Sequence, residues 1–131
     1  MSEFNLRIVT PYKLFFEDKV EGIIVRTTEG EMMVLPNHIN FVSILKVSKA
    51  TIKQNGSYRE ITLAGGLLQV TKDVVTIISH AAEFVDEIDL ERAEQARERL
   101  EQKIKESKEP VEVELLEFKL RKSINRISAK N

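Results

Sequence analysis

Two rows of basic side chains are the residues of this sequence best suited to chemistry. In the first row, Arg92, Arg99 and Lys103 fall within about 40° of one another if the segment is helical. The second row consists of Lys119, Lys122, Arg126 and Lys130. Cations gathered on one face can neutralise a polyphosphate, although charge runs are usually solvated and cations near a helix end also favour its dipole. The rows therefore indicate either an anion site or a solvated face.

Motifs for catalysis and for metal binding are missing from the sequence. There is no GxSxG, HExxH or P-loop pattern, and there is no cysteine to act as a nucleophile or zinc ligand. His38 and His80 lie far apart in the chain, and His38 is most simply a turn residue bonded to backbone. Gly65-Gly66 is not followed by the helix of a phosphate loop, which favours close packing in a strand corner. We expect no catalytic residue and no metal ligand.

Apolar residues at helical spacing predict two helices that would position the cations. The first stripe consists of Leu90, Ala93, Ala96, Leu100 and Ile104. The second consists of Val113, Leu116, Leu120, Ile124 and Ile127. Asp89 is the expected N-cap of the first helix, and Pro110 suits the first turn of the second. The short loop between the helices predicts an antiparallel hairpin, which would bring Arg92 and Arg99 toward Arg126 beside the amide-rich start of the first helix.

The first part of the chain is typical of a β domain. Short apolar runs alternate with turn residues at roughly 8 to 12 residue intervals, as in a sandwich or barrel. The runs are residues 5–10, 20–27, 32–35, 41–47, 50–54, 59–64, 67–71 and 74–79. Asn55-Gly56 suits a tight hairpin. All five glycines precede residue 83. This step in composition predicts a β domain over 1–82 and a helical unit over 83–131, whose small core would let it dock conditionally and move.

Whole-chain composition restricts the partners that the protein can bind. The 131 residues include 20 Lys or Arg and 21 Asp or Glu, for a formal net charge of -1. Such a balance gives no overall field to attract nucleic acid or anionic lipid. No apolar run approaches the roughly 18 residues needed to cross a bilayer, and we expect no signal peptide. The composition predicts a soluble protein that binds no nucleic acid.

Four segments, together with the order of the two domains, resemble those of a known family. They are VTP at 9–11, GEMMVLPNH at 30–38, GGLLQV at 65–70 and IDLERA at 88–93. In combination they resemble the epsilon subunit of bacterial F-type ATP synthases over the full length of the chain. The resemblance implies a β + α fold, with an N-terminal ten-stranded β-sandwich followed by a C-terminal antiparallel two-helix hairpin.

The same resemblance implies a function. The chain would be a non-catalytic central-stalk, or rotor, subunit that couples rotation to proton or sodium flow, and would not itself be an enzyme. Its sandwich would bind the gamma subunit and the membrane c-ring. Its helices would extend along gamma toward the alpha/beta catalytic subunits and inhibit ATP hydrolysis. The subunit would lie at the cytoplasmic face of the bacterial plasma membrane, peripheral to the membrane.

ATP is a regulatory ligand in this expectation, and no cofactor is required. The resemblance implies an ATP site on the folded hairpin, in which the motif supplies the location and arginines neutralise the phosphates. Its residues would be Ile88, Asp89, Arg92, Ala93, Arg99 and Arg126. Two other classes of function stay open: a stand-alone nucleotide-sensing module, and an adaptor with a coiled-coil arm. Co-purification of gamma and the catalytic subunits from detergent extracts would distinguish a synthase subunit from both.

Overall fold

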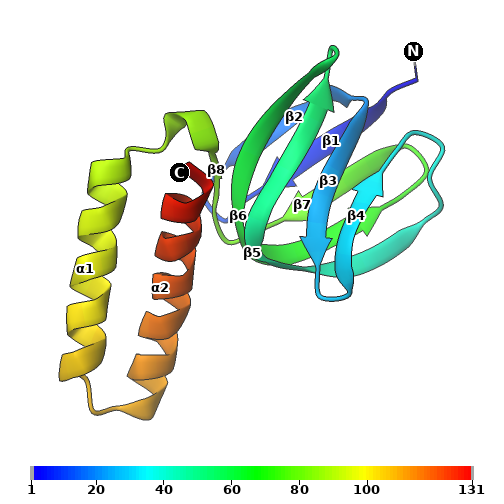
Figure 1. Cartoon of the computed structure of the whole chain (residues 1–131). Helices are drawn as coiled ribbons and strands as arrows, with labels where there is room; N and C mark the ends of the chain where they lie inside the picture. Colours follow the sequence, from blue (N-terminus) through cyan, green and yellow to red (C-terminus); the bar gives the residue numbers. More distant parts are fainter. Residues whose placement is uncertain (1, 131) are drawn as a thin grey trace. The chain divides into compact units, whose positions relative to one another are not determined.

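The computed structural model describes residues 2–130, which form a β unit followed by a helical hairpin (Figure 1). The strands are β1 (Phe4–Val9), β2 (Leu14–Val20), β3 (Gly22–Thr27), β4 (Gly30–Val34), β5 (Phe41–Gln54), β6 (Ser57–Val70), β7 (Val74–Ile78) and β8 (Ala82–Phe84). A short 3-10 turn, η1 (Val85–Glu87), leads into α1 (Leu90–Glu106) and α2 (Pro110–Lys130). No helix in this part of the chain is both long and apolar enough to span a membrane.

Contacts divide the chain into two compact units, the first ending at Phe84 and the second beginning at Val85. The step in composition at residue 82 falls inside β8. This strand stays with the first unit because it pairs with β6, where Ala82 lies opposite Leu63 and Phe84 lies opposite Ile61. The helical unit therefore begins at η1, immediately after the last strand.

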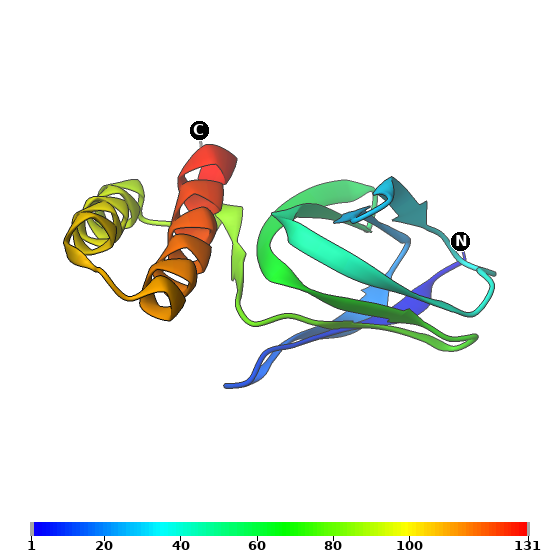
Figure 2. The same ribbon diagram turned by 90° about the horizontal axis from the view of Figure 1, so that it is seen from below.

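One sheet that folds over on itself makes the first unit. Its strand order is β2-β1-β7-β6-β5-β3-β4, and β8 also pairs with β6. The pairing of β1 with β7 is parallel, and the other pairings are antiparallel. The two long strands serve both layers: the last part of β6 pairs with β7, whereas its first part pairs with β8. Figure 2 shows the resulting layers edge-on.

The expectation of ten separate strands is wrong, because residues 2–130 contain eight. The runs 41–47 and 50–54 join into β5, and the runs 59–64 and 67–71 join into β6. The ladder between β5 and β6 skips one position, between Leu45↔Gly66 and Val47↔Ala64, and then continues in the same strands. A sandwich with fewer strands results, since each long strand passes through the corner between layers without ending.

The core lies between the two layers of the sheet. Burial alternates along β1, where Phe4, Leu6 and Ile8 are buried and the two residues between them, Asn5 and Arg7, are exposed. The largest fully buried side chains come from both layers: Leu6, Ile8, Ile23, Ile52, Ile61, Leu63, Leu68 and Ile77. Burying each Leu or Ile contributes about 1.5–3 kcal/mol relative to exposure. Packing between the layers therefore provides the main stabilisation of the unit.

Gly65 and Gly66 form the corner in β6, which confirms the close packing expected for this pair. Both have positive φ, 73° and 130°, values that residues with a Cβ rarely adopt. A Cβ on Gly66 would lie 2.0 Å from the carbonyl oxygen of Ile78. The buried Ser79 hydroxyl secures the corner by donating to the carbonyl of Gly65 at 2.6 Å and accepting from the amide of Ala64 at 3.1 Å.

Replacing Gly66 by alanine should destabilise the β unit more than the same change at Gly30. Gly30 also has positive φ, at 127°, but an added Cβ there meets nothing within 4 Å. Both variants carry backbone strain, and Gly66→Ala adds a clash with backbone atoms, which costs about 1–3 kcal/mol more. Urea denaturation of the two variants measures this difference. Equal losses would show that the corner can relax around a methyl group.

Candidate functional site

The helical hairpin is closed at one end by small residues. Ala93 is fully buried and forms a cluster with Ile88 and Ile127. The Ser123 hydroxyl donates to the carbonyl oxygen of Ala93 at 3.3 Å, so the end of α2 lies against the start of α1. Because small side chains take up little room between two helices, they allow the helix backbones to approach closely. The antiparallel hairpin expected from the sequence is therefore present (Figure 1).

Asp89 is the N-cap of α1, as the sequence predicts. It has extended dihedral angles, with φ -87° and ψ 104°, and its carboxylate accepts a hydrogen bond from the backbone amide of Arg92 at 3.2 Å. One of the helix-start amides that an anion could use is thus bound by this side chain, which is itself exposed. The negative charge of Asp89 also interacts favourably with the helix dipole.

The six predicted site residues divide into a buried pair and an exposed or half-buried set. Ile88 and Ala93 pack into the hairpin core and present little surface to a ligand. Arg92 is exposed on α1, and Arg126 is half-buried near the end of α2. Because Ser123 and Ile127 contact the start of α1, Arg92 and Arg126 belong to the same end of the hairpin. Arg99, also exposed, follows about 10 Å farther along α1.

The apolar stripe of α2 differs from the predicted one at a single position. Ile124 was expected to face α1, but its side chain is 45% exposed, whereas Ser123 is 5% exposed. Leu116, Leu120, Ser123 and Ile127 follow one another at spacings of four, three and four residues, so they lie on one face of α2. Ile124 comes one position after Ser123 and falls outside this face. Hydropathy alone missed Ser123. A small residue at that spacing, opposite Ala93, is the signal that identifies it.

The basic row on α2 is more embedded than a fully solvated face. Arg121 and Lys122 both lie near the Phe118 ring, at 5.8 Å and 5.3 Å from its centroid. Partial burial, and secondarily the charge of Lys119, lowers the pKa of Lys122. The ammonium of Lys130 donates to the carbonyl of Val85 at 3.4 Å. Lys130 therefore ties the end of α2 to η1.

A hollow at the loop end of the hairpin combines charges of both signs. It is lined by Lys103, Glu106, Ser107, Lys108, Glu112, Leu115, Leu116 and Lys119. None of the six predicted ATP-site residues lines it, so it lies away from the expected site. Over residues 2–130 no group of three or more His, Cys, Asp or Glu side chains is placed to hold a metal ion.

An exposed apolar row on the β unit was not found in the sequence analysis. It consists of Ile44, Leu67, Ile78, Val9 and Leu14, which are register partners across β5, β6, β7, β1 and β2. Ile44 is 58% exposed, and Ile78 and Leu14 are each 48% exposed. Register partners share one face of a sheet, so these side chains form a continuous row. Across five strands at the usual strand spacing, the apolar row is about 19 Å long. Contiguous exposed apolar surface of this kind marks interaction sites.

Comparison with known proteins gives matches to both units in order. Residues 3–85 match the family model described as the beta-sandwich domain of the ATP synthase delta/epsilon chain, and residues 86–131 match its long alpha-helix domain. The ATP synthase epsilon chain of Caldicellulosiruptor saccharolyticus is 40% identical over 127 residues, covering 97% of this chain and 93% of that one. The ATP synthase epsilon chain of Ruminococcus albus is 37% identical over 132 residues, covering 100% and 98%.

Solved structures give matches of the same kind. A chain in the cryo-EM structure of the Euglena gracilis mitochondrial ATP synthase, which contains OSCP, F1 and the c-ring, has a TM-score of 0.80 and 25% identity. That match covers 100% of this chain and 83% of the other. A chain from the central stalk and c-ring of the Tetrahymena thermophila mitochondrial enzyme has a TM-score of 0.56 and 16% identity, covering 66% and 69%. The second similarity concerns the fold alone.

Proposed function

The chain belongs to the ATP synthase delta/epsilon chain family, with the epsilon subunits of bacterial F-type ATP synthases, and from this premise we propose that it is a non-catalytic rotor subunit that transmits rotation and restrains ATP hydrolysis. The observation that carries this proposal is that the β unit and the helical hairpin match the two family domains, in order, over residues 3–131. Rotation would be coupled to proton or sodium flow through the assembled complex. The subunit would be peripheral to the membrane, on the cytoplasmic face.

The apolar row is the proposed docking face for the gamma subunit. Its five side chains come from neighbouring strands of one rigid sheet, which suits the transmission of torque because the face cannot deform independently of the core. Apolar surface of this size is stabilised by burial against a partner at about 25 cal/mol per Å². The c-ring would be a second partner of the β unit.

A charge placed in the apolar row should weaken binding to gamma. Ile44 is 58% exposed, so Ile44→Lys should leave the β unit folded while burying an unpaired ammonium in the interface. We expect a loss of affinity of about tenfold or more in a pull-down or calorimetric titration with purified gamma. Tyr58→Lys is the matched control, since Tyr58 is 62% exposed and lies outside the row. Equal binding by Ile44→Lys and the parent would remove this face from the proposal.

The hairpin is the proposed inhibitory element. Few of its side chains are buried, namely Ala93 in α1 and Leu116, Ser123 and Ile127 in α2, so that separating the helices exposes little apolar surface. The two helices have 17 and 21 residues. They would reach roughly 57 Å if laid end to end, against roughly 32 Å as a hairpin. An extended arm of this length would approach the alpha/beta catalytic subunits, with the cations of α2 facing acidic surface.

Removing cations from α2 should relieve inhibition. With Lys119, Lys122 and Arg126 replaced by alanine, the reconstituted enzyme should hydrolyse ATP faster than with the parent chain, because long-range ionic contacts are lost. The charge-matched control replaces Lys103, Lys105 and Lys108 by alanine. Raised salt should reduce the inhibition by the parent in the same direction. If the variant inhibits as strongly as the parent, the row on α2 is only a solvated face.

ATP is the proposed regulatory ligand of the folded hairpin, bound without hydrolysis. Arg92 and Arg126 belong to the same end of the hairpin, next to the start of α1, where backbone amides and the helix dipole favour anions. Arg99 would complete the phosphate contacts, and Asp89 would hold the helix start in shape. Ile88 and Ala93 act through packing, since they fix the separation of the helices. A ligand at 100 times its Kd stabilises the state that it binds by about 2.7 kcal/mol, enough to reverse a balanced equilibrium.

Calorimetric titration of the isolated chain with ATP tests this site. Arg92→Ala or Arg126→Ala should weaken binding by about tenfold or more, because each removes a charge-assisted contact. Lys122 lies one helical turn before Arg126 on α2, so Lys122→Arg should strengthen binding, since a guanidinium binds phosphate in a bidentate manner that an ammonium cannot reproduce. Lys105→Ala, near the other end of α1, is the control.

Absence of heat and of thermal stabilisation at millimolar ATP would exclude the site. A free-standing nucleotide sensor would respond to ATP in this experiment but would not bind gamma. The gamma and ATP experiments together therefore separate the two classes of function.

A further inference from the structure

Asn55 and Gly56 form the tight turn that joins β5 to β6. Gln54 and Ser57 are paired at the ends of the two strands, so the turn consists of these two residues. Both have positive φ, 53° and 75°, as a two-residue turn of this kind requires. Both are also exposed. The turn therefore presents an asparagine followed by a glycine to the solvent.

This pair of residues is chemically reactive. The side-chain amide carbon of an asparagine, Cγ, can be attacked by the backbone nitrogen of the next residue. Glycine in the next position favours the attack, since it has no side chain to obstruct the approach and its backbone is conformationally free. Of the six asparagines in the sequence, Asn55 is the one that glycine follows. Asn55 is therefore the asparagine best suited to lose its side-chain amide.

The reaction has two steps, and water is its co-reactant. In the first step the Gly56 nitrogen gives up its proton and bonds to Cγ of Asn55. The bond between Cγ and Nδ2 breaks, and the Nδ2 group leaves with a proton as ammonia, so that a cyclic succinimide remains. In the second step water adds to one of the two carbonyl carbons of the ring and opens it, which yields aspartate or isoaspartate.

The carboxylate of Glu21 holds the nitrogen that would attack. Glu21 lies between β2 and β3 and is 8% exposed. Its Oε1 accepts a hydrogen bond from the backbone amide of Gly56 at 2.8 Å. The backbone amide of Glu21 donates in turn to the carbonyl oxygen of Lys53 at 2.8 Å, which fixes Glu21 beside the end of β5. The Gly56 amide is therefore bound to a group that is itself held in place.

Gln54 fixes the turn at a second point. Its Nε2 donates to Oδ2 of Asp18 at 2.9 Å and to the carbonyl oxygen of Lys19 at 2.8 Å. These acceptors belong to β2, where Lys19 is the register partner of Asn5 in β1. The end of β5 is thus tied to the strand that leads into Glu21. The turn and the carboxylate stay together as long as these contacts hold.

Glu21 opposes the reaction in two ways. Attack requires the peptide group of Gly56 to turn its nitrogen toward Cγ of Asn55, whereas the hydrogen bond holds that group in the orientation of the turn. Attack also requires the nitrogen to lose its proton, which leaves a negative charge on it. A carboxylate 2.8 Å away repels that charge and so disfavours the loss of the proton. Orientation and charge therefore act in the same direction.

We propose that Asn55 is a site of spontaneous deamidation whose rate Glu21 sets, because it holds the Gly56 nitrogen and opposes its deprotonation. The aspartate product adds a negative charge near the buried Glu21 carboxylate. The isoaspartate product lengthens the backbone of a two-residue turn. Either product weakens the connection between β5 and β6, the two longest strands of the sheet. This site is independent of the functions proposed for the apolar row and the helical hairpin.

Peptide mass spectrometry of the full chain, incubated in mildly alkaline buffer, measures the rate of conversion at Asn55. Glu21→Gln keeps an acceptor oxygen but removes the charge, so it should convert faster than the parent. Glu21→Ala removes both and should convert fastest, about tenfold faster than the parent, as expected when one hydrogen bond to a charged group is lost. Equal rates in the parent and Glu21→Ala, or no conversion in Glu21→Ala, would overturn the proposal.

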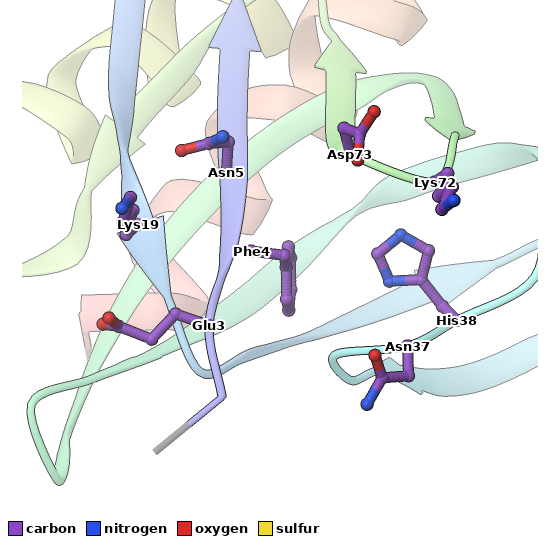
Figure 3. Close-up of a pocket in the computed structure, with 8 residues that line it drawn as sticks. All are labelled: Glu3, Phe4, Asn5, Lys19, Asn37, His38, Lys72 and Asp73. Atoms are coloured by element: carbon purple, nitrogen blue, oxygen red, sulfur yellow. The ribbon is translucent and has the colours of Figure 1, made fainter.

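Asn37 is the internal reference in the same samples. It is also exposed and has a positive φ, 66°, but it is followed by His38, whose Nδ1 lies 2.8 Å from the carbonyl oxygen of Leu35. Figure 3 shows Asn37 and His38 beside an open hollow. Because a bulky residue follows it, Asn37 should stay intact while Asn55 converts. Conversion of both at one rate would contradict the site.

Gly66→Ala separates local release of the turn from unfolding of the β unit. This variant should be destabilised at the corner in β6, while it keeps the hydrogen bond between Glu21 and Gly56. It should therefore convert Asn55 at the rate of the parent. If Gly66→Ala accelerates the conversion as much as Glu21→Ala does, the reaction proceeds through unfolding, and Glu21 does not set its rate.

Discussion

The passage of β6 from one layer of the sheet to the other, at Gly65 and Gly66, is the constraint on which the β unit depends. Ile78 and Ser79 lie so close to Gly66 that no side chain fits there. Because the strand turns within this space, the same strand pairs with β7 in one layer and with β8 in the other. The two inner faces then enclose the core, and the outer face of the first layer brings the apolar row into register.

A different principle governs the hairpin, whose closure depends on small residues and not on large apolar ones. Ala93 and Ser123 let the helices meet, and one hydrogen bond joins them. Few large side chains are buried between the helices, so the free energy that keeps the hairpin closed is modest. The cations near the contact are therefore close to an element that a ligand or partner can shift with a few kcal/mol. This is a suitable arrangement for regulation, whereas the rigid sheet is suitable for attachment.

Local patterns predicted much of the fold, and long-range pairing explains most of what they missed. The Asn55-Gly56 turn, the Asp89 cap and the start of α2 at Pro110 follow from chemistry within a few residues, and the structure confirms each. Strand β2 was missed because Glu17, Asp18 and Lys19 interrupt its apolar residues.

Properties that depend on several strands could not be predicted from local sequence patterns. The expectation of ten strands failed at the corner, where each long strand serves two layers. The apolar row could not be predicted, since its members become neighbours only through the register of five strands. For the candidate site, spacing placed Arg92 and Arg126 at the same end of the hairpin. The apolar stripe of the first helix also predicted that Ala93 would face the second helix, but nothing in the spacing showed that Ile88 would be buried beside it.

The parallel pairing of β1 with β7 has a consequence for the synthesis of the protein. Asn5 is opposite Val74, so β1 lacks one of its two neighbours until almost 70 further residues have been made. At usual rates of translation this takes roughly 4 to 14 s. During that time the edge of β1 that will pair with β7 has no strand beside it. This open edge is exposed to aggregation and to chaperone binding throughout the interval, while the later hairpin, built from local contacts, folds soon after its residues emerge.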